Sequence, residues 1–228
     1  MSKELHSGEL YLPSAPEIVK EQTACLELLY DFNQTRPSEQ KKRQALMQKM
    51  FGKIGDNCYI EPPFHANFGG KHCYFGDHIY ANFGLTVVDD TYIYVGDHTM
   101  FGPHVTLATA SHPILPRLRK QEYQHNQEIH IGKNCWLGSG VIVLPGVTIG
   151  DNTVVGAGSV VTKDLPANVI CAGVPCKVLR EINEHDENTI SKINRSLKTC
   201  FNLPLQEDSF LGNIKGLGKF PAPFSFLH

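Results

Sequence analysis

Histidines have the widest chemical reach of the residues in this sequence, and 11 are present among 228 residues. His112 lies in a polar stretch before Pro113, which biases the backbone of His112 toward an extended conformation. A neutral imidazole, the main form near pH 7, can accept a proton during a reaction. A second group of histidines falls at related spacing: His72, His78, His98 and His104. Their spacing suits either zinc ligands or side chains that point outward from neighbouring turns of a repeat.

The cysteines form an odd, scattered set of seven without a CxxC pair. This pattern argues against a disulfide framework and against a structural zinc site. We expect reduced thiols that are buried as small apolar side chains. The set comprises Cys25, Cys58, Cys73, Cys135, Cys171, Cys176 and Cys200.

The charge balance indicates neither a nucleic acid nor an anionic membrane as a partner, because 21 Lys and Arg nearly cancel 23 Asp and Glu. The N-terminal stretch MSKELHSGEL lacks a basic start followed by an apolar run. No segment approaches the roughly 20 apolar residues needed to span a bilayer. These features predict a soluble, cytoplasmic protein.

Aliphatic residues recur every six positions over the second half of the chain: Ile131, Leu137, Val143, Ile149, Val155 and Val161. Glycine directly follows four of them. Looser copies begin at Ile54, Phe75, Val95 and Phe101. A period of six fits neither an amphipathic helix nor a two-sided strand, and it indicates a solenoid.

Each hexapeptide of such a solenoid supplies one short strand and one corner, and three complete a triangular coil. The aliphatic residue points toward the axis, while Gly, Asp or Asn accommodates the corner. Coils then stack at about 4.8 Å through parallel ladders. The sequence therefore predicts a mainly β fold, a parallel β-helix over residues 53–180, interrupted by a polar, basic loop near 109–128.

Helical spacing of apolar residues precedes the repeat, from Pro16 to Phe32 and again from Pro37 to Phe51. Residues 1–52 are therefore predicted to form a helical hairpin, which is too small to be stable alone and must pack on the solenoid. The segment KVLREINEHDENTI after Cys176 suggests a helix, and residues 181–228 are predicted to form a C-terminal helix and tail.

The chain resembles the maltose/galactoside O-acetyltransferase branch of the hexapeptide acyltransferases over about residues 5–185. The motifs that carry the resemblance, in chain order, are GELY at Gly8–Tyr11, YDFN at Tyr30–Asn33, FGKIG at Phe51–Gly55, EPPF at Glu61–Phe64, YANF at Tyr80–Phe83, VVDD at Val87–Asp90, SHP at Ser111–Pro113, WLGSG at Trp136–Gly140, GAGSVVTKD at Gly156–Asp164 and AGVPCKVLREI at Ala172–Ile182. So many motifs in the right order are far more specific than any single one.

The resemblance implies a left-handed coil and transfer of an acetyl group from acetyl-CoA to a hydroxyl, with no metal in the chemistry and His112 as general base. It places Asn67, Asn82 and Asp90 at the acceptor. It assigns the thioester and CoA to Trp136, Ser139, Ala157, Thr162, Lys163, Lys177 and Arg180. It also implies a homotrimer with active sites between subunits. We expect Asn82 and Asp90 to face the loop that carries His112.

The acceptor is less determined than the chemistry. Relatives often carry acidic residues after GELY, whereas this chain has Leu12, Pro13 and Ala15 there, and Gln22 replaces a basic residue of the first helix. A sugar hydroxyl is the favoured acceptor, and a xenobiotic or an amino acid is the alternative. A zinc enzyme similar to γ-carbonic anhydrases and a non-enzymatic scaffold subunit remain as other classes.

Overall fold

The computed structural model of the chain describes residues 3–188. The chain divides into two compact units, Met1–Glu181 and Ile182–His228. The predicted tail beyond residue 188 lies outside the described residues. No helix between residues 3 and 188 is long and apolar enough to cross a membrane.

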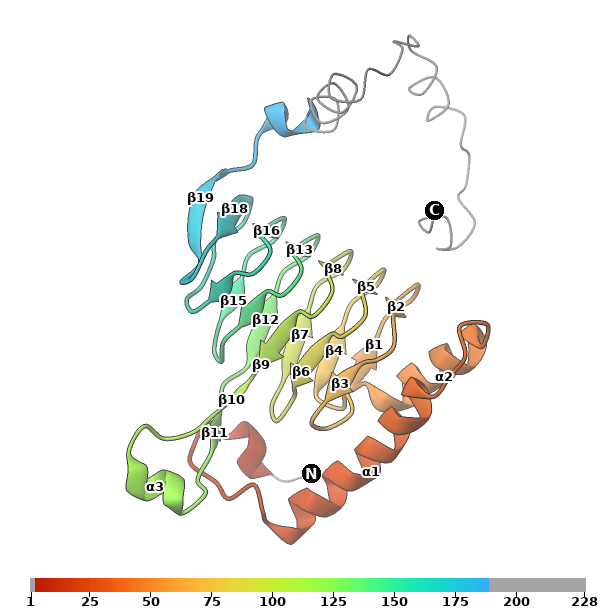
Figure 1. Ribbon diagram of the computed structural model, residues 1–228, viewed down its shortest axis with the longest axis vertical. Helices are drawn as coiled ribbons and strands as arrows, with labels where there is room; N and C mark the ends of the chain where they lie inside the picture. The colour runs from red at the N-terminus through yellow and green to blue at the C-terminus, as the bar shows by residue number, and fades with distance from the viewer. Residues whose placement is uncertain (1–2, 189–228) are drawn as a thin grey trace. The chain divides into compact units, whose positions relative to one another are not determined.

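The first unit is a parallel β-helix whose strands form three ladders (Figure 1). The first face contains β1 (Lys53–Ile54), β4 (Cys73–Phe75), β7 (Ile93–Val95), β12 (Ile129–Ile131) and β15 (Thr148–Ile149). The second face contains β2 (Tyr59–Ile60), β5 (Tyr80–Ala81), β8 (Met100–Phe101), β13 (Trp136–Leu137), β16 (Val154–Val155) and β18 (Val169–Ala172). The third face contains β3 (His65–Ala66), β6 (Thr86–Val88), β9 (Thr106–Ala108), β14 (Ile142–Val143) and β17 (Val160–Val161). The coil is left-handed, as the resemblance implied.

The chain passes from face to face through three columns of corners. We call the corner between the first and second faces the first corner, that between the second and third faces the second corner, and that between the third and first faces the third corner. The six aliphatic residues of the regular repeat all point inward, and none is more than 3% exposed. Each such side chain contributes about 1.5–3 kcal/mol by burial, so the predicted period of six is confirmed as the spacing of the core.

The glycines that directly follow four of these six core residues permit the coils to stack closely. A Cβ at Gly132 would lie 2.6 Å from the backbone nitrogen of Asp151 in the next coil. Two residues later Asn134 has φ +53°, and His98 occupies the equivalent place with φ +61°. Asn tolerates this left-handed conformation better than most residues do. The first corner is therefore specified by backbone requirements.

The predicted helical hairpin is confirmed. It consists of α1 (Pro16–Asn33) and α2 (Gln40–Met50), which contact β3 and β1 respectively. Asn33 ends α1 and clamps Phe64, because its Nδ2 donates to the carbonyl oxygen of Phe64 at 2.8 Å and its Oδ1 accepts from the Phe64 nitrogen at 2.9 Å. The Phe64 ring then packs on Phe51, with ring centroids 5.6 Å apart.

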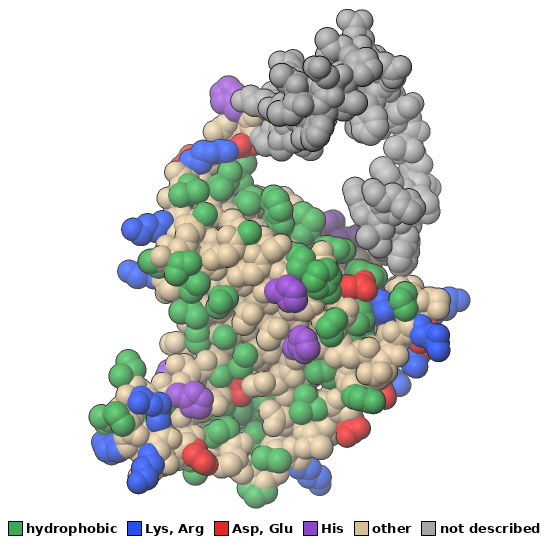
Figure 2. Space-filling model, viewed as in Figure 1, with side chains coloured by type: hydrophobic (Ala, Val, Ile, Leu, Met, Phe, Trp, Pro, Cys, Tyr) green, Lys and Arg blue, Asp and Glu red, His purple; other side chains and the backbone are tan. Residues whose placement is uncertain are grey.

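The predicted loop leaves the coil at the third corner, after β9. It contains β10 (Ala110–Ser111), α3 (Pro116–Lys120) and β11 (His125–Asn126), and β10 pairs antiparallel with β11. The short 3-10 helix η1 (Lys3–His6) contacts β11. Lys and Arg side chains gather over α3 (Figure 2). The insertion is thus a folded arm that the N-terminal segment supports.

The prediction of a helix directly after Cys176 is wrong for residues 177–181. Lys177–Glu181 form strand β19, which pairs antiparallel with β18, and the 3-10 helix η2 (Glu184–Asn188) follows. Gly173, at φ +106°, helps to reverse the chain between the two strands. Because β16 pairs with only one edge of β18, the backbone groups of the other edge need a partner, and pairing with β19 outweighs a weak helical preference.

Candidate active site

Asp90 is a carboxylate with both oxygens hydrogen-bonded. It lies at the third corner and is 5% exposed. The Nδ2 of Asn67 donates to its Oδ2 at 2.8 Å, and the Nε2 of Gln124 donates to its Oδ1 at 2.9 Å. Amide donors hold a carboxylate without neutralising its charge, and each oxygen keeps a lone pair for a further donor. Two of the residues predicted to bind the acceptor, Asn67 and Asp90, are therefore in direct contact.

Gln124 extends this contact to the N-terminal segment. Its Nε2 lies 2.6 Å from the hydroxyl of Tyr11 and 3.1 Å from Oδ1 of Asn126. The Nδ2 of Asn126 donates in turn to the Tyr11 hydroxyl at 3.0 Å and to the carbonyl oxygen of Leu5 at 2.9 Å. Burial holds the pKa of Tyr11 well above its usual value, so the hydroxyl stays protonated. We call Tyr11, Asn67, Asp90, Gln124 and Asn126 the buried polar cluster.

Asp89 fixes the turn that follows Asn67. Its carboxylate accepts from the backbone nitrogens of Phe68 at 2.7 Å and Gly70 at 2.9 Å. Burial raises the pKa of Asp89 to about 6, although the backbone donors act in the opposite direction. Gly69 and Gly70 have φ +62° and +91°, where a side chain would be strained. The turn therefore holds Asn67 at a fixed distance from the neighbouring coil.

His112 is exposed and directly follows β10. Its Nδ1 lies 3.2 Å from the carbonyl oxygen of Tyr123. A carbonyl can only accept a hydrogen bond, so Nδ1 carries the hydrogen and Nε2 of the neutral ring has a lone pair available for a proton. Tyr123 directly precedes Gln124, which connects His112 to the buried polar cluster.

Two histidines, the half-buried His6 and the buried His72, dock the N-terminal segment. The Nδ1 of His6 lies 3.0 Å from Oγ1 of Thr91, and its ring stacks on Tyr92 with centroids 4.1 Å apart. The ring of His72 approaches edge-on at 4.8 Å. Burial, followed by the charge of His72, lowers the pKa of His6 to about 4, and burial also lowers the pKa of His72. The segment that carries Tyr11 is therefore held by neutral imidazoles.

The residues predicted to contact the thioester lie elsewhere on the coil. Trp136 stands on the second face and is 52% exposed. Ser139 and Ala157 are exposed at the second corner of adjacent coils, where the nitrogen of Gly158 donates to the Ser139 carbonyl oxygen at 2.8 Å. A Cβ at Gly138 would lie 2.7 Å from the Ala157 nitrogen. Small residues thus keep a narrow backbone path open along this corner.

The predicted CoA-binding cations occupy the last coils. Thr162 and Lys163 directly follow β17, while Lys177 and Arg180 lie on β19, and all four are exposed. We use the name exposed strip for a set of seven residues: Trp136, Ser139, Ala157, Thr162, Lys163, Lys177 and Arg180. Its small residues and terminal cations suit an extended ligand that ends in phosphates.

The structure separates the predicted residues into two groups. Asp90 and the His112 loop are at the third corner, whereas Asn82 follows β5 at the second corner, where its Oδ1 accepts from the Phe83 nitrogen at 2.8 Å. Within one chain Asn82 and the His112 loop therefore lie at different corners, and a role of Asn82 at the acceptor stays a prediction. Among residues 3–188, no hydrogen bond joins Trp136, Ser139 or Ala157 to His112 or to the buried polar cluster.

Sequence reasoning did not assign Gln124 or Asn126 to the site, and it did not foresee that the Tyr11 hydroxyl contacts them. Tyr11 belongs to the GELY motif, but its partner is 113 residues away. The alternation of Gln124 and Asn126 around His125 was the available signal, since two amides on one side of a short strand favour a shared network.

The remaining histidines do not converge. His72 contacts the Asp89 carbonyl oxygen through Nδ1, and His78, His98 and His104 take left-handed corner positions with φ between +57° and +61°. Among residues 3–188, no group of three His, Cys, Asp or Glu could hold a metal ion. Their spacing therefore follows the repeat, and the geometry gives the zinc hypothesis no support.

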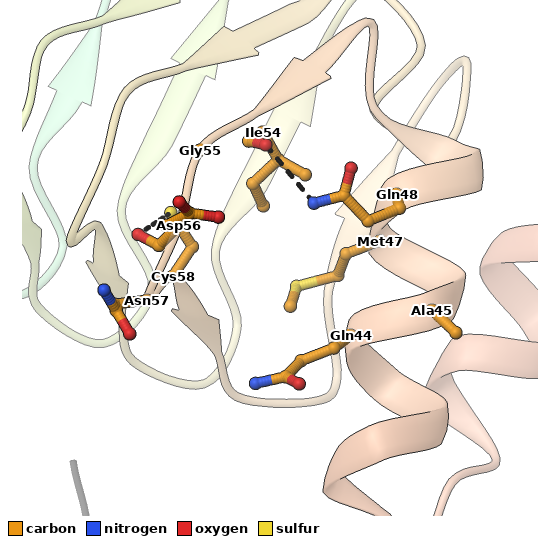
Figure 3. A pocket seen from close by; sticks show the side chains of 9 residues that line it. All are labelled: Gln44, Ala45, Met47, Gln48, Ile54, Gly55, Asp56, Asn57 and Cys58. Carbon is orange, nitrogen blue, oxygen red and sulfur yellow. Dashed lines mark hydrogen bonds between the residues drawn. The ribbon is translucent and has the colours of Figure 1, made fainter. Parts of the chain in front are cut away.

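A groove of about 490 Å³ lies between α2 and the first coil (Figure 3). Gln44 and Gln48 line it from the helix, and Asp56, Asn57 and Cys58 line it from the first corner. None of the residues predicted to bind acceptor or CoA borders this groove. It therefore lies apart from the candidate site.

Comparison with known proteins covers both the hairpin and the solenoid. Residues 5–55 match the family described as maltose acetyltransferase hexapeptide capping motif, and residues 128–163 match bacterial transferase hexapeptide (six repeats). The galactoside O-acetyltransferase of Lactococcus lactis subsp. lactis is 56% identical over 187 residues, which are 82% of this chain and 90% of that protein. The galactoside O-acetyltransferase of Escherichia coli is 43% identical over 188 residues, 82% of this chain and 92% of that protein.

Solved structures agree with these matches. A galactoside acetyltransferase in complex with coenzyme A superimposes with a TM-score of 0.79 at 43% identity, covering 82% of this chain and 93% of that one. A maltose O-acetyltransferase from Clostridium difficile 630 gives 0.78 at 38% identity, covering 80% and 97%. Since fold, motifs and sequence identity coincide over both the hairpin and the coil, the chain belongs to the galactoside and maltose O-acetyltransferase branch of the hexapeptide-repeat acyltransferases.

Proposed function

We propose that this acetyltransferase moves the acetyl group of acetyl-CoA to a hydroxyl of a sugar or glycoside, with His112 as the general base. One observation carries the proposal: the hydrogen bond from His112 Nδ1 to the Tyr123 carbonyl oxygen leaves Nε2 as the proton acceptor. The buried polar cluster adjoins this base through Gln124. Carboxylate and amide groups of this kind recognise hydroxyls.

The chemistry follows from these positions. As the acceptor oxygen attacks the thioester carbonyl carbon, a C–O bond forms and Nε2 of His112 takes the hydroxyl proton. The tetrahedral intermediate then expels the CoA sulfur, and the imidazolium returns the proton to the thiolate. Asn67 and Asp90 orient the acceptor, with Asn82 contributing from the second corner. Atoms and charge balance without a metal ion.

The exposed strip binds acetyl-CoA. Backbone groups at Ser139 and Ala157 contact the pantetheine arm, and Trp136 borders the acetyl group. The phosphates contact Thr162, Lys163, Lys177 and Arg180, because cationic side chains suit a polyanionic nucleotide. A cytoplasmic location stays a prediction from the sequence.

The active enzyme is a homotrimer with each site between two subunits. The support is the separation of the base from the residues proposed for the thioester: His112 lies at the third corner, whereas Trp136 stands on the second face and Ser139 and Ala157 lie at the second corner. A column of Tyr80, Met100 and Trp136 on the second face is 43–52% exposed, an apolar surface of the kind that partners cover. Ile114, between β10 and α3 in the loop, is 92% exposed.

An acceptor screen tests the function. The purified chain is mixed with acetyl-CoA and with sugars, glycosides, amino acids or xenobiotic alcohols, and release of the free CoA thiol is followed. We expect turnover with a sugar or glycoside. Turnover only with an amino acid or a xenobiotic would replace the acceptor class, and no turnover with any hydroxyl would contradict the function.

Mixed assembly tests the shared site. His112→Ala removes the base, and Ala157→Leu blocks the path of the pantetheine arm, so each variant alone should be nearly inactive. A site is active only when an Ala157→Leu subunit supplies His112 and the adjacent His112→Ala subunit supplies Ala157. When the two variants are co-expressed in equal amounts and assemble at random, this combination should restore about a quarter of wild-type turnover. Failure to recover activity in verified mixed trimers, or a fully active monomer, would contradict the shared site.

A further inference from the structure

We propose that Gln124 is the positioning residue of the acceptor site: its side chain sets the orientation of Asp90, and its main chain holds the segment that orients His112. This inference rests on the proposed function, because it concerns how the acceptor is held for transfer. It adds a residue that neither the motifs nor the family resemblance had assigned.

The side chain of Gln124 sits at the centre of the buried polar cluster and is itself 7% exposed as a residue. Its amide nitrogen has two hydrogens and three acceptors within 3.1 Å: the Tyr11 hydroxyl, Asp90 Oδ1 and Asn126 Oδ1. Asp90 therefore receives one amide hydrogen from Gln124 and one from Asn67, one on each oxygen. Two donors on opposite oxygens fix the plane of the carboxylate.

The charge of Asp90 is preserved by this arrangement. No salt bridge among residues 3–188 includes Asp90. Neutral donors stabilise the carboxylate without cancelling its charge, so its unused lone pairs stay strong acceptors for hydroxyl groups. Methionine at position 124 would remove the donor, and glutamate would place a second carboxylate against the first.

The main chain of Gln124 acts on the base independently of its side chain. The Tyr11 nitrogen donates to the Gln124 carbonyl oxygen at 2.9 Å, and the Gln124 nitrogen donates to the Tyr11 carbonyl oxygen at 3.0 Å. This pair fixes the chain one residue after Tyr123, whose carbonyl orients His112. A side-chain substitution at position 124 should therefore leave the base in place and disturb acceptor binding. The acceptor KM should rise while kcat changes little.

The test compares Gln124→Met with Gln121→Met, Asp90→Ala and the double variant Gln124→Met/Asp90→Ala in the full-length chain. Gln121 is an exposed glutamine at the end of α3 on the same loop, so it controls for the chemistry of the substitution. The assay uses the best acceptor of the screen. We expect Gln124→Met to raise the acceptor KM about 10-fold, with kcat within about threefold of wild type and the acetyl-CoA KM unchanged.

The double variant distinguishes positioning from a separate contact. If Gln124 acts through Asp90, kcat/KM for the acceptor in the double variant should equal that of Asp90→Ala. Multiplicative losses, or a Gln124→Met enzyme that matches Gln121→Met, would overturn the inference.

If Gln124→Met does not fold, Tyr11→Phe provides the test, since it removes the hydroxyl that accepts a hydrogen bond from the Gln124 amide and keeps the ring. A raised acceptor KM at constant acetyl-CoA KM supports the inference, and an unchanged acceptor KM overturns it. Inactivity of the wild-type chain with every acceptor would refute the proposed function, whereas an active wild type with unaffected variants refutes only the role of Gln124.

Discussion

The buried polar cluster and the exposed strip are built in opposite ways. The cluster draws on the N-terminal segment, the third corner of two neighbouring coils and the inserted loop, and its side chains, all buried except the half-buried Asn67, hydrogen-bond one another. The strip takes Trp136, Ser139 and Ala157 from consecutive coils, where the repeat places them at regular spacing. Its side chains are exposed, and the acetyl-CoA site that we propose there relies on the path along the backbone more than on any one of them.

This difference matches the two ligands that we propose. A thioester arm is long and nearly the same in every reaction, so a repeating backbone path with cations at its end is sufficient to bind it. A hydroxyl acceptor must be oriented within a few tenths of an ångström, which requires rigid, satisfied polar groups. Substitutions in the cluster should therefore affect acceptor kinetics, and substitutions in the strip should affect acetyl-CoA kinetics.

Removal of the base should give the largest effect. His112→Ala is expected to lower kcat by about 10²–10⁴, the usual contribution of a positioned general base, with little change in the acetyl-CoA KM. Steady-state kinetics at saturating acceptor measures it, and His125→Ala on the same loop is the control. A folded, trimeric variant with near wild-type turnover would show that His112 is not the base.

Loss of the cluster's carboxylate should come next. Asp90→Ala is expected to reduce kcat/KM for the acceptor by about 10–100-fold, because a charged hydrogen-bond partner is lost. It should also lower the free energy of unfolding by about 1–3 kcal/mol, since the amides of Asn67 and Gln124 lose their acceptor. Urea unfolding measures the second quantity. An unchanged acceptor KM would remove Asp90 from the binding site.

The cations of the strip should have a smaller and different effect. Lys163→Ala or Arg180→Ala is expected to raise the acetyl-CoA KM about 3–10-fold and to leave kcat mostly intact, as loss of uniform binding does. Lys41→Ala, on the exposed side of α2, controls for a change in net charge. A collapse of kcat at unchanged KM would mean that these cations take part in the chemistry.

The same contrast explains what could be predicted from the sequence. The coil, its corners and the strip follow a period of six, so each residue's role depends on its near neighbours in sequence. Counted from Phe75, the period places core residues at Ala81 and Val87, so Asn82 and Asp90 follow different faces of the coil, although the family motifs alone do not separate them. The cluster depends on pairs such as Tyr11 with Gln124, 113 residues apart, and no local pattern encodes such pairs. Strand β19 was mistaken for a helix for the same reason, because its partner β18 decides its conformation.

The smallest predicted effect concerns pH and the N-terminal segment. The pKa of His6 is about 4 in the folded chain against 6.5 for a free side chain, so the folded state disfavours the proton. The stability that His6 contributes is complete above pH 6.5 and is lost as pH falls toward 4. The pKa of His72 is also lowered, so its protonation destabilises the fold in the same direction. The negative charge of Glu21, which is paired with Lys71, raises the pKa of both histidines and so opposes this effect. Asp89 has the opposite sign, because its pKa of about 6 exceeds 3.8 and its protonation on acidification favours the folded state.

A matched comparison isolates His6 from these neighbours. His6→Phe keeps a ring to stack on Tyr92 but cannot titrate, so its Tm should fall less between pH 7 and pH 5 than that of wild type, by on the order of 2 °C. His185→Phe, exposed in η2, should retain the wild-type difference. Because the segment carries Tyr11, acidification should weaken acceptor binding in wild type more than in His6→Phe, while the acetyl-CoA KM of the two stays equal. An equal pH response of wild type and His6→Phe in both measurements would show that the acid sensitivity of the fold does not reside in the segment that supports the buried polar cluster.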